Sequence, residues 1–487
     1  MFPNSAFARC IVLVGVAGLA STEPAIASGP SACPAPDPRL EGRWADSAAP
    51  FEHADSARTH LFTRIQSPSA SDFSSGVEIS VEALTDLPAI YNSTLLPGGD
   101  VVVLGGMTGG GERPQGPYVA RVDRETWSVE WRTELLDSIG LDEWNYPGVV
   151  AAHANGDLYA AYGYRLARID PATGSVLDIT VLPTVQDPAD TAYNGFVAAS
   201  DGVLILKSHH RPPGCETDGF RAFLECGTDG VSPSVLAAVD PNTMEILSTV
   251  RAEELIGGRI SASRVDGREV VYAPGLDRLF RFTYDDGVLE RDETWGPVAY
   301  REGEQTPGTA AAALNGWVVI QNNALPTDAP LSLTAVSQAD SDLRHTITPF
   351  GDQPRSMNPS MPSVDPSSMT VFASDGLAGA VGAYRLDPQT GFEEVWRVDQ
   401  SSFSFSILIG PSDDRVFIAT DALESETFFY EKEQVVWRDA ATGRELARSP
   451  ALDRIGGATM LPACGGEVFY PSTRAGAFYR LSVETGG

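Results

Sequence analysis

Two kinds of tight-turn signal alternate along the chain, and each occurs eight times. The first kind joins a Gly, Asn or Asp turn directly to an apolar, β-branched run, as in NGDLYAAY from Asn155 and NGWVVI from Asn315. The second kind places an Asp-rich turn between two strand-like runs, as in LARIDPATGSVLD from Leu166 and AYRLDPQTGFEEVW from Ala383. Both kinds predict hairpins, because Asp can hydrogen-bond its own turn, Pro fixes φ and Gly accepts a positive φ.

The alternation predicts how the hairpins combine. Each pair of signals supplies four antiparallel strands, A to D, with the first turn between A and B and the second between C and D. Four-stranded sheets packed radially form a β-propeller. No long Pro, Gly or Ser linker separates the units, which disfavours an array of separate domains. We therefore expect an all-β fold, a single eight-bladed β-propeller over residues 76–487.

The last unit ends at Gly487, just after its second turn, and therefore lacks an outermost strand. The run GVEISVEAL, residues 76–84, is a suitable strand near the other end of the propeller region. We expect this N-terminal strand to complete the last blade and to close the ring. A disulfide between Cys33 and Cys464 would then lock the seam.

The first residues are typical of an export signal. Arg9 is followed by a short apolar run from Cys10 to Ala20 and by small residues at Ala25 to Ala27. We expect a signal peptide at 1–27, cut after Ala27, then an N-terminal extension at 28–75. No later run reaches the length of a membrane span. The sequence thus predicts a periplasmic or secreted protein, and we expect a soluble monomer.

Four cysteines remain after removal of the signal: Cys33, Cys215, Cys226 and Cys464. Disulfides persist in oxidising compartments, and four cysteines allow three pairings that spacing alone does not decide. We favour Cys215 with Cys226, and Cys33 with Cys464.

The formal net charge is −31. Phosphate backbones need a basic footprint, so the composition excludes nucleic acid as a partner. A plain interpretation of the acidity is a surface suited to extracellular water.

The Asp-Pro-x-Thr-Gly turns resemble the repeats of quinoprotein-like propellers, an eight-bladed superfamily that includes dehydrogenases dependent on pyrroloquinoline quinone (PQQ). The resemblance implies the fold over nearly the whole mature chain. The enzymes of that family also carry a docking Trp soon after the turn Gly in most blades, and here only Trp131, Trp396 and, less closely, Trp295 correspond. Their vicinal Cys pair is absent. These departures disfavour PQQ with calcium as the cofactor, and cofactor-free scaffold proteins share the same repeat.

The longest loop inside a blade is HHRPPGCETDGFRAFLECGTDG, which follows strand B of the third blade. It belongs to the ring face that carries long B to C loops, where binding and catalysis concentrate. Its base holds the candidate catalytic residues Lys207, His209, His210 and Arg211, which could hold an anionic substrate and supply acid–base chemistry.

Two alternatives for this loop stay open. The basic residues could be solvated and paired with Glu216, Asp218 or Glu225. One histidine with Asp218 and Asp229 could bind a metal, although adjacent residues of an extended chain point to opposite sides. A lid stapled by Cys215 and Cys226, without metal, is the favoured interpretation.

Polar residues also recur where inner strands begin, on the same face. The candidate ligand-binding residues are Tyr91, Asn92, Asn145, Tyr146, Tyr193, Asn194, Arg259 and Gln305. The alternative is that they only cap strands by bonding to backbone. We expect a small-molecule pocket here, in an enzyme that is either a quinone-type oxidoreductase or a lyase or hydrolase of an anionic substrate. A non-catalytic ligand-binding protein and an assembly scaffold remain alternatives.

Overall fold

The computed structural model describes residues 37–106, 116–136, 143–351, 353, 355–424, 430–455, 458–472 and 476–485. All of them belong to one compact unit, Ala32–Gly487. No helix within these ranges is long and apolar enough to cross a membrane. The predicted signal peptide lies outside the described residues.

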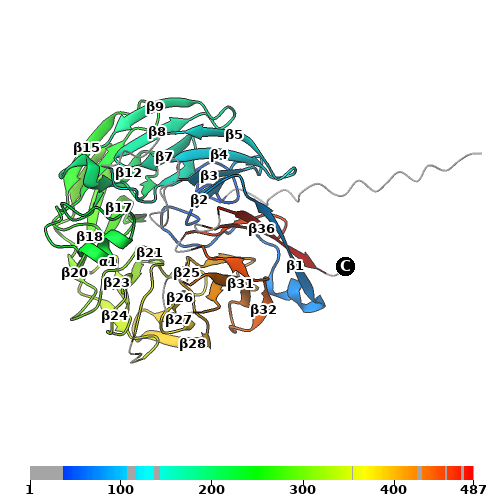
Figure 1. The fold of residues 1–487 in the computed structure, drawn as a ribbon. Helices are drawn as coiled ribbons and strands as arrows, with labels where there is room; N and C mark the ends of the chain where they lie inside the picture. Colours follow the sequence, from blue (N-terminus) through cyan, green and yellow to red (C-terminus); the bar gives the residue numbers. More distant parts are fainter. Residues whose placement is uncertain are drawn as a thin grey trace, which may run out of the picture. The chain divides into compact units, whose positions relative to one another are not determined.

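Eight antiparallel sheets of four paired strands are arranged in a ring, which confirms the predicted propeller (Figure 1). In each sheet the innermost strand comes first. Blades 1 to 4 consist of β2 (Ile90–Leu95), β3 (Val101–Gly105), β4 (Tyr118–Asp123) and β5 (Ser128–Glu134); β6 (Val149–Ala152), β7 (Leu158–Tyr162), β8 (Arg165–Ile169) and β9 (Val176–Val181); β11 (Phe196–Ala198), β12 (Leu204–Lys207), β14 (Val235–Val239) and β15 (Ile246–Arg251); and β16 (Ser261–Val265), β17 (Arg268–Pro274), β18 (Arg278–Asp285) and β19 (Val288–Arg291).

Blades 5 to 8 repeat the pattern. They consist of β21 (Ala311–Leu314), β22 (Trp317–Gln321), β23 (Leu333–Ser337) and β24 (Arg344–Ile347); β25 (Ser363–Asp365), β26 (Thr370–Asp375), β27 (Ala380–Asp387) and β28 (Gly391–Asp399); β29 (Ile407–Ile409), β30 (Val416–Ala422), β31 (Lys432–Asp439) and β32 (Glu445–Arg448); and β34 (Leu461–Ala463), β35 (Glu467–Pro471), β36 (Phe478–Thr485) and β1 (Val77–Leu84). Short strands β20 (Val298–Ala299) and β33 (Leu452–Asp453) pair with β18 and β31, and β10 (Thr191–Ala192) pairs with β13 (His209–His210).

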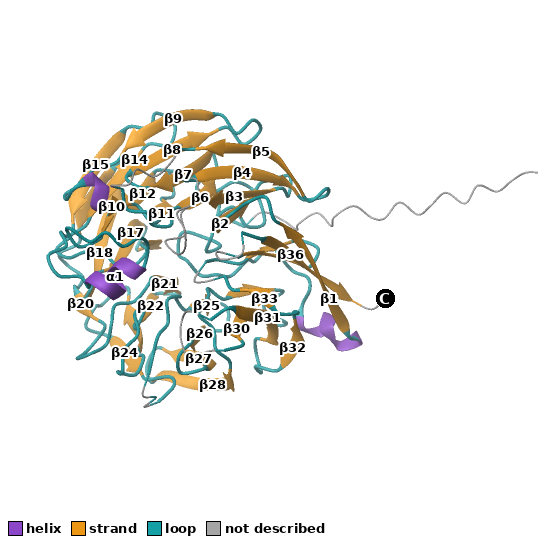
Figure 2. Cartoon of the chain, in the orientation of Figure 1, coloured by secondary structure: helices purple, strands orange, loops and turns teal. Residues whose placement is uncertain are grey.

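The described chain contains little helix, as Figure 2 shows. The helical segments are η1 (Ala70–Ser75), η2 (Pro188–Asp190) and α1 (Arg221–Cys226). None of the three forms a layer of its own, so the fold is all-β, as predicted.

The turns have the conformations that their residues predict. Asp266 and Gly267 both have positive φ, 51° and 80°, as do Asn315 and Gly316, at 39° and 84°. Two consecutive positive φ values define the type I′ turn, whose twist matches that of the flanking strands. In the second kind of turn, the Asp170 carboxylate accepts a hydrogen bond from Ala172 N at 2.7 Å. These local preferences set the two hairpins of each blade.

The ring closes through the N-terminal strand, as expected. Strand β1 pairs antiparallel with β36 from Val77 opposite Thr485 to Leu84 opposite Phe478. It therefore forms the outermost strand of blade 8, whose other three strands come from the C-terminal end. The two ends of the propeller are joined by a continuous ladder of backbone hydrogen bonds.

Outer strands dock onto the second turn of the next blade. A Cβ on Gly174 would lie 2.5 Å from the Trp131 ring, and one on Gly443 would lie 2.7 Å from the Trp396 ring, so both turns need glycine. Trp131 donates to Pro171 O at 3.2 Å. Tryptophan thus joins neighbouring blades at the positions where the sequence placed the docking motif.

The centre of the ring is filled by residues 44–65, here called the central segment, which appears as the blue loop inside the ring in Figure 1. It contacts the inner strands of successive blades in chain order, through its backbone in six bonds and through the Ser56 side chain in one. The bonds are Leu95 N to Ala49 O, Ala152 N to Pro50 O, Ser56 Oγ to Ala198 O, Ala262 N to Ser56 O, Ala313 N to Ala57 O, Val364 N to Thr59 O and Leu408 N to His60 O. These contacts reach blades 1 to 7. The segment therefore satisfies edge groups that the innermost strands would otherwise leave bare.

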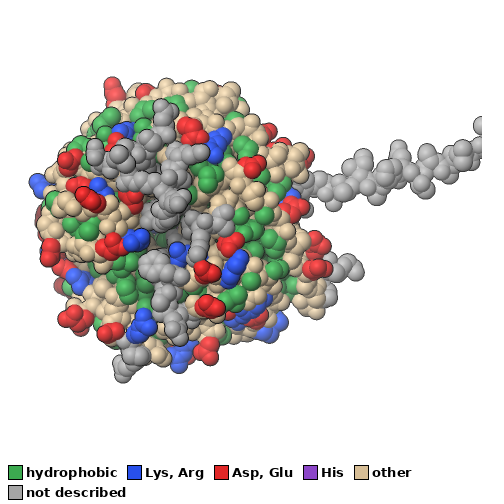
Figure 3. All heavy atoms as spheres, viewed as in Figure 1, with side chains coloured by type: hydrophobic (Ala, Val, Ile, Leu, Met, Phe, Trp, Pro, Cys, Tyr) green, Lys and Arg blue, Asp and Glu red, His purple; other side chains and the backbone are tan. Residues whose placement is uncertain are grey.

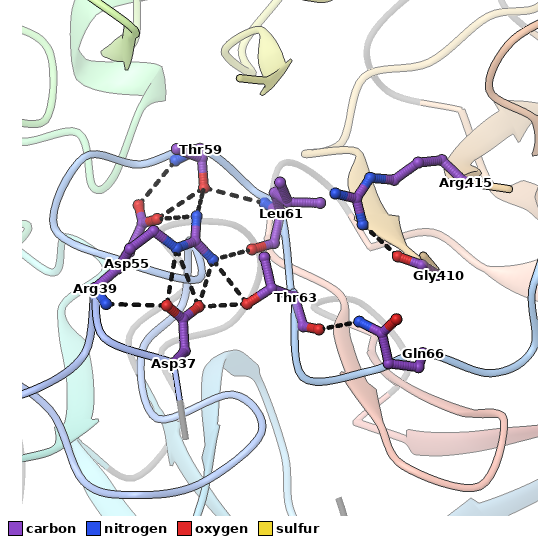
Figure 4. Close-up of polar contacts among 9 residues, drawn as sticks. All are labelled: Asp37, Arg39, Asp55, Thr59, Leu61, Thr63, Gln66, Gly410 and Arg415. Carbon is purple, nitrogen blue, oxygen red and sulfur yellow. Dashed lines mark hydrogen bonds and ion pairs between the residues drawn. The ribbon is translucent and has the colours of Figure 1, made fainter. Parts of the chain in front are cut away.

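Arg39 fixes the path of this segment (Figure 4). Its guanidinium contacts Asp37 and Asp55, each at 2.6 Å, and donates to Leu61 O at 2.9 Å. Thr63 donates to the same Asp37 carboxylate. One arginine thus joins the residues just before the central segment to its second half.

Three of the four cysteines in the two predicted disulfides are described. Cys215 and Cys226 are bonded to each other, as expected. Cys464 is also disulfide-bonded, and its expected partner, Cys33, lies outside the described residues.

Candidate functional site

The four candidate catalytic residues are buried, not solvated. Lys207 ends strand β12, and His209 and His210 form β13, which folds back onto β10. The exposed fractions of Lys207, His209, His210 and Arg211 are 0%, 2%, 0% and 5%. The alternative of a solvated basic loop is therefore wrong, because strand pairing pulls the base of the loop into the protein.

Two of these residues have their polar groups fully occupied by the surrounding structure. His210 Nδ1 lies 3.1 Å from Thr191 Oγ1, and its Nε2 lies 2.9 Å from Ser208 Oγ. Arg211 donates through Nε to Asp190 at 2.6 Å, instead of to the acidic residues of its own loop. His210 and Arg211 thus hold the base of the loop in place.

Lys207 and His209 converge on one backbone oxygen. Lys207 Nζ donates to Ile256 O at 2.7 Å, and His209 Nδ1 lies 3.3 Å from the same oxygen. A carbonyl can only accept, so Nδ1 carries the proton and Nε2 of the neutral ring has a free lone pair. His209 Nε2 is buried and has no hydrogen-bond partner among the described residues.

Burial governs the protonation of both groups. Desolvation, together with the nearby guanidiniums of Arg259 and Arg58, holds the pKa of Lys207 well below its ordinary value. Desolvation and the charge of Lys207 likewise hold the pKa of His209 well below its ordinary value. Both side chains therefore hold a proton less readily than they would in water, and they meet at Ile256 O.

Aromatic rings enclose His209. Its ring stacks on Trp144 with centroids 5.4 Å apart, and it meets Tyr146 at 4.9 Å and Phe223 at 5.0 Å. Trp144 Nε1 and Asn145 Oδ1 are also buried without partners in the described structure. Tyr146, a predicted ligand residue, remains partly exposed.

Arg259 joins three of the other predicted ligand residues. It donates to Tyr91 Oη at 2.8 Å and to Asn194 O at 3.2 Å. Tyr146 lies close enough for the Arg259 charge to lower its pKa, although burial outweighs this and raises the pKa overall. Asn194 Oδ1 is another buried atom without a partner in the described ranges. The structure therefore brings Tyr91, Tyr146, Asn194 and Arg259 together.

Two predicted ligand residues, Tyr193 and Gln305, form no hydrogen bond with this group in the described ranges. Asn92 reaches it through Glu52, to which its Nδ2 donates at 3.3 Å. Asn92 is fully buried, with Oδ1 accepting from Val150 N at 2.6 Å. Tyr193 donates to Pro183 O at 2.5 Å. Gln305 donates to Pro330 O at 2.8 Å and to Ser332 Oγ at 2.7 Å, and its Oε1 accepts from Glu302 N at 2.8 Å. Asn92 joins neighbouring blades, Tyr193 is anchored beside blade 2, and Gln305 ties the connection after blade 4 to blade 5.

The central segment contributes residues that sequence analysis did not identify. Glu52 lies 3.1 Å from Arg58, 3.0 Å from His53 and 3.6 Å from Arg259, and all four are buried. Burial would raise the pKa of Glu52, but Arg259, His53 and Arg58 hold it below the ordinary value. Glu52 is thus a buried carboxylate with two guanidinium partners.

The loop of residues 208–233, here called the lid loop, covers this region. Gly219 N donates to Asn145 O at 2.9 Å, and Asn145 N donates to Asp218 Oδ1 at 3.1 Å, which pins the loop to blade 2. Phe220 packs against two apolar clusters, one with Trp144 and one with Phe403. The lid loop therefore extends from blade 3 to residues next to blade 7.

The described residues do not fit the cofactors of the resemblance. No group of three or more His, Cys, Asp or Glu side chains that could hold a metal occurs among them. The ring nitrogens of His210 and the Asp218 carboxylate already have protein partners. The metal site considered for the lid loop, one histidine with Asp218 and Asp229, is therefore not among such groups in the described ranges.

No family model matches the chain, and no curated protein matches its sequence. Among solved structures, a europium-containing methanol dehydrogenase matches with a TM-score of 0.56 at 10% identity, over 88% of this chain and 90% of its own. The Dos1 propeller matches with a TM-score of 0.50 at 9% identity, over 85% and 96%. At such identities the likeness shows the fold alone. Fold and topology define the chain as an eight-bladed β-propeller.

Proposed function

We propose that the protein is an exported β-propeller that binds a small anionic molecule carrying hydroxyl groups beneath the lid loop. The observation that carries the proposal is a group of buried polar atoms, close together, that have no hydrogen-bond partner among the described residues. These atoms are Trp144 Nε1, Asn145 Oδ1, Asn194 Oδ1 and His209 Nε2. Native structures leave few buried polar atoms unpaired, and ligand or ordered water satisfies most exceptions.

The kind of unpaired atom suggests the kind of ligand. Asn145 Oδ1, Asn194 Oδ1 and His209 Nε2 are acceptors, so they need hydroxyl or N–H donors. Arg259 supplies a cationic donor nearby, Lys207 supplies a further N–H donor, and no described carboxylate contacts Lys207. A sugar acid or another hydroxy carboxylate would satisfy both sets.

Tyr91 and Tyr146 indicate from which side a ligand would reach the site. Both are partly exposed, whereas Lys207, His209 and Arg259 are buried. The central segment occupies the other side of this group through Glu52 and His53. Entry would therefore take place on the side of the long loops.

Export is supported by two features. The first 27 residues have the charge, apolar run and small residues of a signal peptide. The disulfide between Cys215 and Cys226 persists in oxidising compartments. Acidic side chains with arginines among them are spread over the visible face, which suits a protein in extracellular water (Figure 3).

The experiment is a thermal-shift screen of the purified protein. The panel contains gluconate, glucuronate, galacturonate and pyruvate, with glucose as the uncharged counterpart and PQQ with calcium as the cofactor arm. We expect a saturable rise of Tm with at least one sugar acid and none with glucose. Silence across all carboxylates would contradict the proposal.

Matched variants locate the response. Tyr91→Phe removes one hydroxyl beside Arg259, and His209→Phe keeps a ring between Trp144 and Phe223. Each should increase at least tenfold the ligand concentration that is needed for a half-maximal rise of Tm. Arg444→Ala, at an exposed ion pair on the turn after β31, should leave it unchanged.

An assembly scaffold is the second candidate, because the central segment fills the middle of the ring and Arg259 is held by protein groups. A scaffold predicts no response to any member of the panel.

A further inference from the structure

Lysine is almost absent from this chain. The sequence has 34 Lys and Arg residues, and only Lys207 and Lys432 are lysines. Lys432 is half exposed and pairs with Asp453 at 2.7 Å. Lys207 is fully buried in the candidate site. The chain thus uses arginine for nearly every cation but places a lysine here.

The difference between the two side chains is chemical. Arginine stays protonated in proteins, whereas a buried lysine can lose its proton and become a nucleophile. Desolvation and a neighbouring cation are two known ways to activate a lysine amine. Lys207 has both, since it is fully buried and Arg259 lies near it.

The surroundings of Lys207 Nζ leave its lone pair available. Its hydrogen bond to Ile256 O uses one N–H as donor. No carboxylate among the described residues contacts it to hold a proton. His209 bonds the same oxygen and keeps Nε2 free for proton transfer.

We propose that Lys207 forms a reversible imine with the carbonyl group of a small oxo acid. The inference rests on the proposed function, because it takes the same site and names the ligand as a carboxylate that also carries an aldehyde or ketone. Arg259 and Tyr91 Oη would hold the carboxylate, and the carbonyl carbon would lie against Lys207 Nζ.

The reaction needs no oxidant or reductant. The Nζ lone pair attacks the carbonyl carbon, and the carbonyl electron pair moves to oxygen. His209 Nε2 passes one proton from Nζ to that oxygen, which gives a carbinolamine. As the nitrogen lone pair closes the C=N bond, the C–O bond breaks, the departing hydroxyl receives the remaining Nζ proton through His209 Nε2, and water leaves.

The test is reductive trapping on the full-length protein. Protein is incubated with pyruvate or glucuronate and sodium cyanoborohydride, which reduces an imine to a stable secondary amine. We expect one adduct per chain, located at Lys207 by peptide mapping. Lactate, which lacks the carbonyl of pyruvate, should give none.

Two variants control the assignment. Lys432→Arg removes the other lysine and should leave trapping unchanged. Lys207→Met fills a similar volume without an amine and should abolish it. His209→Phe should slow trapping at least tenfold and flatten its pH dependence, a result that a purely structural role would not give.

The outcomes separate this inference from the function on which it rests. No adduct at Lys207 with either oxo acid, in protein that gluconate still stabilises, would overturn the imine and keep the binding site. Absence of both trapping and stabilisation would overturn both. Equal labelling of Lys432 and Lys207 would also contradict the inference, since it would mean that Lys207 has no special reactivity.

Discussion

Arg58 and Lys207 are both fully buried basic residues near the centre of the ring, but their surroundings differ. Arg58 donates to Glu52 at 3.1 Å and to Ile260 O at 2.5 Å, and its partners belong to the fold. Lys207 has one carbonyl contact, to Ile256 O, which it shares with His209 Nδ1, and Nε2 of that ring has no partner among the described residues. The buried charges of the central segment are therefore paired within the fold, whereas the polar groups under the lid loop are arranged to receive a ligand.

This contrast teaches how to separate structural from functional burial. A buried charge that is paired and hydrogen-bonded contributes to holding the fold, and removing its partner is costly. A buried polar group without a partner weakens the fold unless a ligand completes it. Substitutions in the central segment should consequently lower stability, whereas substitutions under the lid loop should weaken ligand binding with little loss of stability.

The largest effect is expected for Glu52→Gln in the central segment. It leaves Arg58 and Arg259 without a counter-charge in a buried site, which should cost about 3–5 kcal/mol in the free energy of unfolding. Denaturant titration measures this directly, with Arg444→Ala as the exposed control. A loss no larger than that of the control would show that the paired network is not structural.

The second-largest effect is expected from acid, which should destabilise the central segment through His60. Burial lowers the pKa of His60 to about 3, from an ordinary value near 6.5. The folded state thus disfavours the protonated ring, so the contribution is complete above about pH 6.5 and is lost as the pH falls toward 3. His60→Asn should flatten the fall of Tm between these values, while His345→Asn on outer strand β24 should not. Parallel curves would contradict the assignment.

The lid loop should show an intermediate effect. Replacing Cys215 and Cys226 together by serine opens a closed loop with a sequence separation of 11, which should cost about 2–3 kcal/mol in unfolding. The same variant should weaken sugar-acid binding, because Phe220 and Asp218 lose their anchor over the site. Thermal shift with and without gluconate measures both. Full affinity in the variant would mean that the lid loop does not shape the site.

The smallest stability change is expected at Lys207. Lys207→Met removes a desolvated amine with one hydrogen bond and keeps a similar volume, so the free energy of unfolding should change by less than about 1.5 kcal/mol. Chemical denaturation measures it against Glu52→Gln. A loss as large as that of Glu52→Gln would place Lys207 with the structural network.

Much of the fold was predictable because turn chemistry is local. Asn315-Gly316 and Asp266-Gly267 determine their hairpins by themselves, and the Asp170 turn does so through its own carboxylate. The closing strand followed from the absence of a last strand before Gly487. The lid disulfide was predicted from two nearby cysteines.

The centre of the ring was not predictable in the same way. The central segment has positive φ at Ala54, Arg58 and His60 and no strand periodicity, so nothing local indicates that it contacts seven blades. Glu52 therefore looked like one more acidic residue in an acidic chain. The burial of His209 and His210 depends on the pairing of β13 with β10. Strands of two residues have no sequence pattern from which this pairing could be predicted. The prediction included Tyr91, Tyr146 and Arg259 because polar residues recur at the starts of inner strands.

The most direct test of the proposed site is a calorimetric titration of gluconate into wild-type protein and into Lys207→Met. The account predicts saturable binding with one ligand per chain in the wild type, and at least tenfold weaker binding in the variant at nearly unchanged stability. Equal affinity in both proteins, or no saturable binding in the wild type, would contradict it.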